Sequence, residues 1–218
     1  MIKPLTEPLP SNGLLYFMDG QFLFRYKERG GAEISKYLTM DDVAAAFVQV
    51  EQDSGWMPAG VLRVGTSQQG RWYVYSAPAQ KVTITVPPAE RLTIPIPRTV
   101  MLGIGTKFYI WALKETHFNP NAKAYHAPFS NVHADGLICW GRAKTAEVDA
   151  KHARRIWDDF FYANFNNDLS NKKSVKHPAN VLEMLRSLHD ENKRKYPVAD
   201  LVETRETIGQ AIDRKVRN

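Results

Sequence analysis

Hydrophobic positions gather in short runs rich in β-forming residues along residues 61–114, and turn residues separate the runs. In the run 81–86, Val82, Ile84 and Val86 alternate with threonines, as expected of a strand with one buried face. Further β-rich runs are separated by Gly, Pro, Ser and Gln. The complete set of runs covers residues 61–64, 71–75, 81–86, 91–96, 100–104 and 107–113. Together they predict an antiparallel meander.

Prolines interrupt this region in two places. Pro87-Pro88 predicts a rigid turn. Pro95 and Pro97 predict that the run 91–96 is an edge or broken strand, because proline cannot donate a hydrogen bond to a strand ladder.

Two apolar, aromatic runs precede the meander, at residues 14–18 and 21–26, and an Asp-Gly pair joins them. This combination is a strong signal for a β-hairpin. A helix is predicted over 39–50, because Thr39 and Asp42 have the spacing of a capping box and apolar residues follow at spacings of four and three.

The chain changes character after the meander. Residues 115–138 contain few apolar positions and form a long connection, a kind of segment that is usually functional or disordered. Apolar stripes at helical spacing then predict helices over 148–161, 181–188 and 201–216, the last weakened by Gly209. Strands followed by helices, without strand–helix alternation, predict an α+β fold in which helices cover one face or the ends of the meander.

The composition is that of a folded protein. The chain has 218 residues, of which 44% are hydrophobic, enough for one large domain or one domain with additions. No apolar run has the length of a membrane span, and the first residues lack the pattern of a secretory signal. We therefore expect a cytoplasmic protein without a membrane segment.

The basic charge does not predict nucleic-acid binding. The formal net charge is +6, but acidic residues are interspersed throughout. The densest basic groups are Lys172-Lys173 and residues 193–195, which are interpreted as a solvated loop or helix end.

Cys139 is the only cysteine of the chain, which excludes an intrachain disulfide and a zinc site of several thiolates. It is either reactive or a small buried hydrophobe. Its context favours reactivity: Asn131 lies eight positions earlier, Asp135-Gly136 can turn the backbone, and Leu-Ile precedes the thiol. Such an arrangement can hold a nucleophile beside a donor for an oxyanion.

The run from Asn131 to Cys139 resembles the active-site segment of ubiquitin-conjugating enzymes. In that family a His-Pro-Asn motif precedes the catalytic cysteine at the same Asn-to-Cys spacing. The resemblance implies a ubiquitin-conjugating-like antiparallel meander flanked by helices over residues 39–195. Residues 1–38 would then add an N-terminal β-hairpin, and residues 196–218 a helical tail.

Among bacterial relatives, the added hairpin and the ending Ile138-Cys139-Trp140-Gly141 most resemble protein B of the PRTRC gene cassettes, a divergent ubiquitin-conjugating-like family. Such plasmid-associated cassettes also carry a ubiquitin-like protein, a ThiF-like adenylating enzyme, a metalloprotease-like protein and a partitioning-protein relative. The resemblance implies these proteins as partners.

The family's residues transfer only where the motif matches. Cys139 matches the thioester-forming nucleophile, and Asn131 matches the asparagine that stabilises the oxyanion or orders the loop. The His-Pro pair is absent, and Phe129 and Ser130 stand in its place. The implied activity is acceptance of a ubiquitin-like protein on Cys139 as a thioester, followed by transfer to an amine. No cofactor is implied.

Four further residues are candidates for lining the site: Ser130, His133, Asp135 and Trp140. We expect Trp140 to pack beside the thiol and shield it from water, and Asp135 to serve the turn rather than acid–base chemistry.

Three alternatives to the conjugating activity remain. His133 or His126 could activate the thiol in a cysteine protease or acyltransferase. The same two residues could gather with His117 around a metal, but no helical histidine pair or carboxylate supports such a site. The last alternative is a non-catalytic adaptor that binds a ubiquitin-like protein.

His152 is not a candidate for any of these sites, because it lies on an apolar stripe and is predicted to be a core residue.

Overall fold

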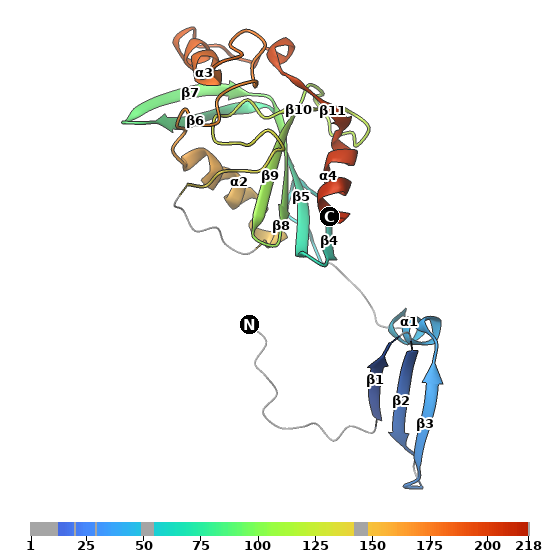
Figure 1. Cartoon of the computed structure of the whole chain (residues 1–218). Coiled ribbons are helices and arrows are strands. Elements are labelled where there is room, and N and C mark those ends of the chain that lie inside the picture. The colour runs from blue at the N-terminus through green and yellow to red at the C-terminus, as the bar shows by residue number, and fades with distance from the viewer. Residues whose placement is uncertain (1–12, 20, 29, 49–54, 142–147, 218) are drawn as a thin grey trace. The chain divides into compact units, whose positions relative to one another are not determined.

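The computed structural model describes residues 13–19, 21–28, 30–48, 55–141 and 148–217 (Figure 1). The strands are β1 Gly13–Met18, β2 Gln21–Lys27, β3 Glu33–Leu38, β4 Val61–Ser67, β5 Gly70–Ala77, β6 Gln80–Val86, β7 Glu90–Ile96, β8 Arg98–Ile104, β9 Lys107–Leu113, β10 Lys123–His126 and β11 Glu203–Thr207. The helices are α1 Met40–Val48, α2 Ala153–Tyr162, α3 Val181–Asp190 and α4 Ile208–Arg217, with short 3-10 turns at Ala150–His152 and Val198–Asp200. They form two compact units, residues 1–55 and 56–218.

The first unit holds the predicted hairpin and helix. β1 pairs antiparallel with β2, and Met18 lies opposite Gln21. The capping box is confirmed, because the Asp42 amide donates to Thr39 Oγ1 (3.1 Å) and the Thr39 amide donates to Asp42 Oδ2 (2.9 Å). β3, which extends the hairpin to three strands, was not predicted. Gly20 of the predicted turn and Val50 of the predicted helix lie outside the described residues.

The second unit contains all six strands predicted between residues 61 and 114, but they do not form one continuous meander. The six-stranded antiparallel sheet has the order β11-β10-β9-β8-β5-β4. β6 and β7 pair only with each other in a separate two-stranded ribbon, so that β5 pairs with β8. The predicted meander is therefore interrupted in its middle. The fold is α+β with antiparallel sheets.

The prolines lie where the ribbon tolerates them. Pro87-Pro88 forms the turn between β6 and β7, with a cis peptide bond. Pro95 lies in β7 opposite Lys81. Because a two-stranded ribbon has a free edge on each strand, a missing N–H donor is acceptable there. The prediction of an edge strand at 91–96 is thus confirmed.

Helices cover both faces of the central strands, which corrects the expectation of one covered face. Tyr73 and Tyr75 of β5 pack in a core with α2 and α3, whereas Trp72 and Val74 pack on the opposite side with α4. Figure 1 shows α2 and α4 on the two sides of this sheet. Double coverage explains why β5, β8 and β9 are apolar in nearly every position rather than alternating.

Two details of the predicted helices are corrected. His152 is not in the core but exposed, because α2 begins only at Ala153 and His152 precedes its first turn. The stripe 201–216 is divided, with β11 preceding α4. Gly209 lies in the first turn of α4, and its amide donates to the Pro120 carbonyl (2.8 Å). A Cβ at this position would lie 2.8 Å from the same oxygen, so the glycine permits close approach rather than weakening the helix.

Among the described residues, no helix is long and apolar enough to cross a membrane.

Candidate functional site

Cys139 is exposed and lies opposite Asn131 in a narrow hairpin. The Cys139 amide donates to the Asn131 carbonyl (2.8 Å), and the His133 amide donates to the Leu137 carbonyl (2.8 Å). The turn closes where the Gly136 amide donates to the His133 carbonyl (3.0 Å). We call residues 129–133 the Asn131 arm and residues 137–141 the Cys139 arm. The eight-residue spacing therefore brings the backbones of the two predicted site residues into contact.

The Cys139 arm is anchored by backbone hydrogen bonds to β9. The Ile138 amide donates to the Phe108 carbonyl (2.8 Å), and the Ile110 amide donates to the Gly136 carbonyl (2.8 Å). This segment therefore continues the antiparallel pairing that β10 makes further along β9. Cys139 therefore follows directly after a stretch that is paired with β9.

Trp140, which follows Cys139 in the chain, packs against the core. Its ring meets Phe108 edge-on (5.7 Å between centroids) and Phe160 of α2 edge-on (6.3 Å). Such edge-to-face pairs are favourable beyond their buried area. The residue that directly follows the exposed Cys139 is therefore seated on the core.

Asp135 holds the turn with both oxygens. Oδ1 accepts from the Leu137 amide (3.1 Å), and Oδ2 accepts from Lys215 Nζ of α4 (2.7 Å). Burial raises the pKa of Asp135, but the hydrogen bonds from Lys215 and Leu137 outweigh it and lower the pKa overall. The carboxylate is therefore kept charged and engaged. Gly136 has φ +91°, a conformation that favours glycine.

The Asn131 arm is anchored through side chains. Phe129 is fully buried and lies in an aromatic cluster with Phe160, Phe161 and Phe165, at centroid distances of 5.5, 5.3 and 6.1 Å. The residue that stands in place of the expected histidine is thus itself an anchor, although it supports the arm by packing rather than by hydrogen bonding.

Two polar side chains of this arm, those of Ser130 and Asn131, are buried and unpaired among the described residues. Asn131 is 4% exposed, and both its Nδ2 and its Oδ1 lack a partner within the described part of the chain, as does Ser130 Oγ. Leaving a buried polar group without a partner costs about 1–3 kcal/mol. The Asn131 amide thus lies on the arm opposite the exposed Cys139, and its donors are not used by the described residues.

A buried lysine, Lys173, holds the Asn131 arm through hydrogen bonds, and the sequence did not indicate this role. Lys173 Nζ donates to the carbonyl of Phe129 (2.7 Å) and to that of Val132. Its third bond goes to the carbonyl of Leu169. Burial lowers the pKa of Lys173 to about 8. The interpretation of Lys172-Lys173 as wholly solvated was wrong for Lys173, which is 3% exposed. No local signal distinguishes it from Lys172.

The histidines lie away from the thiol. His133 is exposed beside the turn, two pairs along the hairpin from Cys139, or roughly 7 Å at the rise of a strand. His126 hydrogen-bonds to the backbone of Ala134, also at the turn, and burial lowers its pKa, as does the charge of Lys173. His117 contacts Thr116. Among the described residues no hydrogen bond joins a histidine to the thiol, and no group of three possible metal ligands gathers.

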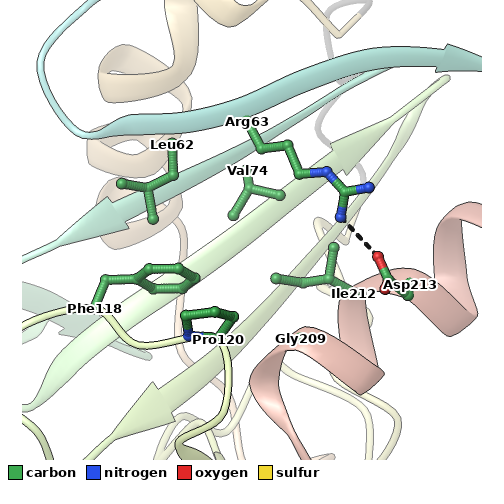
Figure 2. A pocket seen from close by; sticks show the side chains of 8 residues that line it. All are labelled: Leu62, Arg63, Val74, Phe118, Pro120, Gly209, Ile212 and Asp213. Atoms are coloured by element: carbon green, nitrogen blue, oxygen red, sulfur yellow. Dashed lines mark hydrogen bonds and ion pairs between the residues drawn. The ribbon is translucent and has the colours of Figure 1, made fainter.

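A separate pocket of about 290 Å³ lies between β4, β5 and α4, shown in Figure 2. It is lined by Leu62, Arg63, Val74, Phe118, Pro120, Gly209, Ile212 and Asp213. Arg63 Nη1 lies 2.7 Å from Asp213 Oδ1, and the guanidinium also lies over the Trp72 ring (4.9 Å). The two charged side chains of the pocket are therefore already engaged with each other, and the rest of the pocket wall is mainly apolar.

The chain matches a protein-family model. The family model described as "Prokaryotic E2 family D" matches residues 36–204. This range includes the Cys139 hairpin, Lys173 and most of the six-stranded sheet. No curated protein and no solved structure matches the chain significantly.

Proposed function

The chain belongs to prokaryotic E2 family D, and on that premise we propose that it carries a ubiquitin-like protein as a thioester on Cys139. The observation that carries this proposal is the hairpin itself. An exposed thiol is fixed opposite Asn131, whose amide is buried and has no partner among the described residues. A core cysteine needs neither exposure nor such a neighbour.

The charging step exchanges one thioester for another. The Cys139 thiolate attacks the C-terminal carbonyl of the ubiquitin-like protein on the cysteine of an adenylating enzyme. A new carbon–sulfur bond forms to Sγ, the old one breaks, and the enzyme's thiolate leaves. In the transfer step an amine attacks the same carbonyl, a carbon–nitrogen bond forms, Cys139 leaves as thiolate, and the amine's proton passes to water.

Negative charge develops on the carbonyl oxygen in both steps. We propose that in the transfer step, where an amine rather than a thiolate attacks, the Asn131 Nδ2 donors stabilise this charge or order the loop around it. One such donor is worth about 10²–10³ in rate. Because a thiolate is a good leaving group, the site needs no strong acid, and none of the histidines has to reach the sulfur.

The partners follow from the same proposal. Members of an E2-like family work with a ubiquitin-like protein and an adenylating enzyme. We propose more specifically that these are the ubiquitin-like and ThiF-like proteins of a PRTRC-type cassette, with the metalloprotease-like protein as a further member.

A charging assay tests the proposal. The protein is incubated with ATP, the adenylating enzyme and the ubiquitin-like protein, and the products are separated on a non-reducing gel. We expect an adduct that thiols remove and that Cys139→Ala abolishes. Because the chain has no second cysteine, this control is unambiguous. An adduct that survives Cys139→Ala would falsify the proposal. Stable binding of the ubiquitin-like protein without any adduct would instead support the adaptor alternative.

The role of Asn131 is tested separately. We expect Asn131→Ala to charge at the wild-type rate and to discharge to a free amine about 10²–10³ times more slowly, the value of one oxyanion donor. Discharge is followed by the disappearance of the adduct after the ATP is removed. Asn171→Ala, at an exposed position, is the matched control. Unchanged discharge in Asn131→Ala would remove the amide from the chemistry.

A further inference from the structure

We propose that Lys173 is the positioning residue of this site, holding the backbone on both sides of Asn131 so that its side-chain amide stays aimed at the thioester. This inference rests on the proposed function, because it assigns a role within the same transfer reaction. It is carried by the hydrogen bonds of a buried side chain that comes from a distant part of the chain.

The contacts of Lys173 match the chemistry of an ammonium group. Its three N–H donors meet three backbone carbonyls, those of Phe129, Val132 and Leu169. Two of these carbonyls flank the pair Ser130-Asn131. The lysine therefore fixes the backbone before and after Asn131 without engaging the amide itself, which is left unpaired.

These contacts also set the direction of the neighbouring amides. The C=O and N–H of a planar peptide point in opposite directions. With the Val132 carbonyl turned toward Lys173, the following N–H of His133 points away from it and donates to the Leu137 carbonyl (2.8 Å). Lys173 thus supports the register that places Asn131 opposite Cys139.

The segment that carries Lys173 is itself fixed. The buried carboxylate of Asp200 accepts from Ser174 Oγ (3.0 Å) and from the Lys176 amide (2.8 Å), both through Oδ1. The Asp200 carbonyl also accepts from the Val175 amide (3.0 Å). The ammonium group is therefore delivered from an ordered backbone, as a positioning role requires.

No carboxylate pairs with Lys173 within the part of the chain that the structure describes. A buried cation without an ion pair is costly, and its partners are backbone dipoles alone. A purely structural contact at this place would need no charge. Two of the three Lys173 donors reach carbonyls of the Asn131 arm and the third reaches Leu169 of its own segment, so one ammonium group joins the two segments.

The test separates charging from discharge. In Lys173→Met we expect charging of Cys139 to change less than about twofold, and discharge to a free amine to slow by about 10–100-fold, part of the effect of losing the donor itself. In the Asn131→Ala background the same substitution should slow discharge less than about twofold further, because Lys173 acts through Asn131. Multiplicative effects of the two substitutions would overturn the inference.

A second readout does not depend on the thioester. Amide hydrogen exchange in the uncharged protein should accelerate at least about tenfold in Lys173→Met at Cys139 and His133, whose bonds cross the hairpin, and less at Ile138, which bonds to β9. Equal acceleration at all three amides, or none, would refute the positioning role. If the wild-type protein forms no thioester, the proposed function fails, while the exchange result still decides whether Lys173 holds the hairpin.

Two further variants complete the design. Lys173→Gln keeps two N–H donors without the charge, so its effects should lie between those of the wild type and Lys173→Met. It replaces the methionine variant in both measurements if that variant does not fold. Lys172→Met, at the exposed neighbouring position, should behave as wild type. If Lys173→Gln and Lys172→Met both discharge at the wild-type rate while folding normally, Lys173 has no positioning role.

Discussion

The two arms of the Cys139 hairpin are held by different kinds of interaction. The Cys139 arm is paired with β9 through backbone hydrogen bonds, and its thiol is exposed. The Asn131 arm is buried, and it is held by the packing of Phe129 and by the ammonium group of Lys173. One arm thus depends on the sheet, and the other on side chains that come from distant parts of the chain.

In the proposed chemistry, the presentation of the nucleophile and the placement of the asparagine therefore depend on different parts of the structure. The nucleophile is presented by a backbone ladder, which tolerates most side-chain changes. The asparagine is placed by particular side chains, so its geometry can be lost while the thiol remains in position. Substitutions on the two arms should therefore produce different defects: loss of transfer on one arm, and loss of local order around the thiol on the other.

The largest expected effect is on the Asn131 arm. Phe129→Ala removes a fully buried ring and should lower the free energy of unfolding by about 3–5 kcal/mol, measured by urea denaturation. Phe165→Ala removes a ring of the same cluster that lies outside the arm. We expect similar destabilisation from both, but slower discharge only from Phe129→Ala. Equal discharge rates would show that the packing of the arm does not affect transfer.

The next effect is a pH dependence of stability. Burial lowers the pKa of Lys173 from 10.5 to about 8, so the folded protein releases this proton at lower pH than the unfolded chain does. Between these values the unfolded state binds more protons, and stability rises with pH.

Relative to Lys173→Met, the unfolding free energy of the wild type should therefore increase from pH 8 to pH 10.5, by a total on the order of 3 kcal/mol. Denaturation of both proteins at several pH values measures it, and Lys172→Met serves as the control. A difference between wild type and Lys173→Met that is constant across this range would contradict the burial of a charged lysine.

The smallest effect of the three concerns the turn that leads into the Cys139 arm. Gly136 has φ +91°, and a Cβ would lie 2.8 Å from the Trp111 ring, which is itself buried. Gly136→Ala should cost about 1–3 kcal/mol and speed exchange of the Ile110 amide, which bonds to Gly136. Gly141→Ala, where φ is also positive but the space is open, separates backbone strain from the clash.

Strand positions were predictable because their alternation and their turn residues are local signals. The contact between Asn131 and Cys139 could also be predicted, because an eight-residue spacing with Asp-Gly between the two residues is typical of a hairpin. The separation of the β6–β7 ribbon was not, since pairing partners are chosen in three dimensions. The strands β10 and β11 are too short for a periodic signal, and β3, although as long as β1, lacks a regular alternation of buried and exposed positions.

The support of the site was hidden for a different reason. Lysine in a polar segment is usually solvated, and nothing near Lys173 in the sequence distinguishes it from Lys172. Its burial follows from carbonyls that lie 41 and 44 positions earlier in the chain. Phe129 was noted as a departure from a motif, whereas its packing against α2 shows that the position has kept an anchoring role by other means.

The long sequence separation of these contacts bears on how the protein is made. Asp135 meets Lys215, which follows it by 80 positions. On a ribosome the hairpin emerges before both of the lysines that hold it, so its own turn can form early but its side-chain support comes later. The Cys139 arm can pair with β9, which emerges before it, whereas the Asn131 arm gains the support of Lys173 only after a further 41 residues have followed Val132.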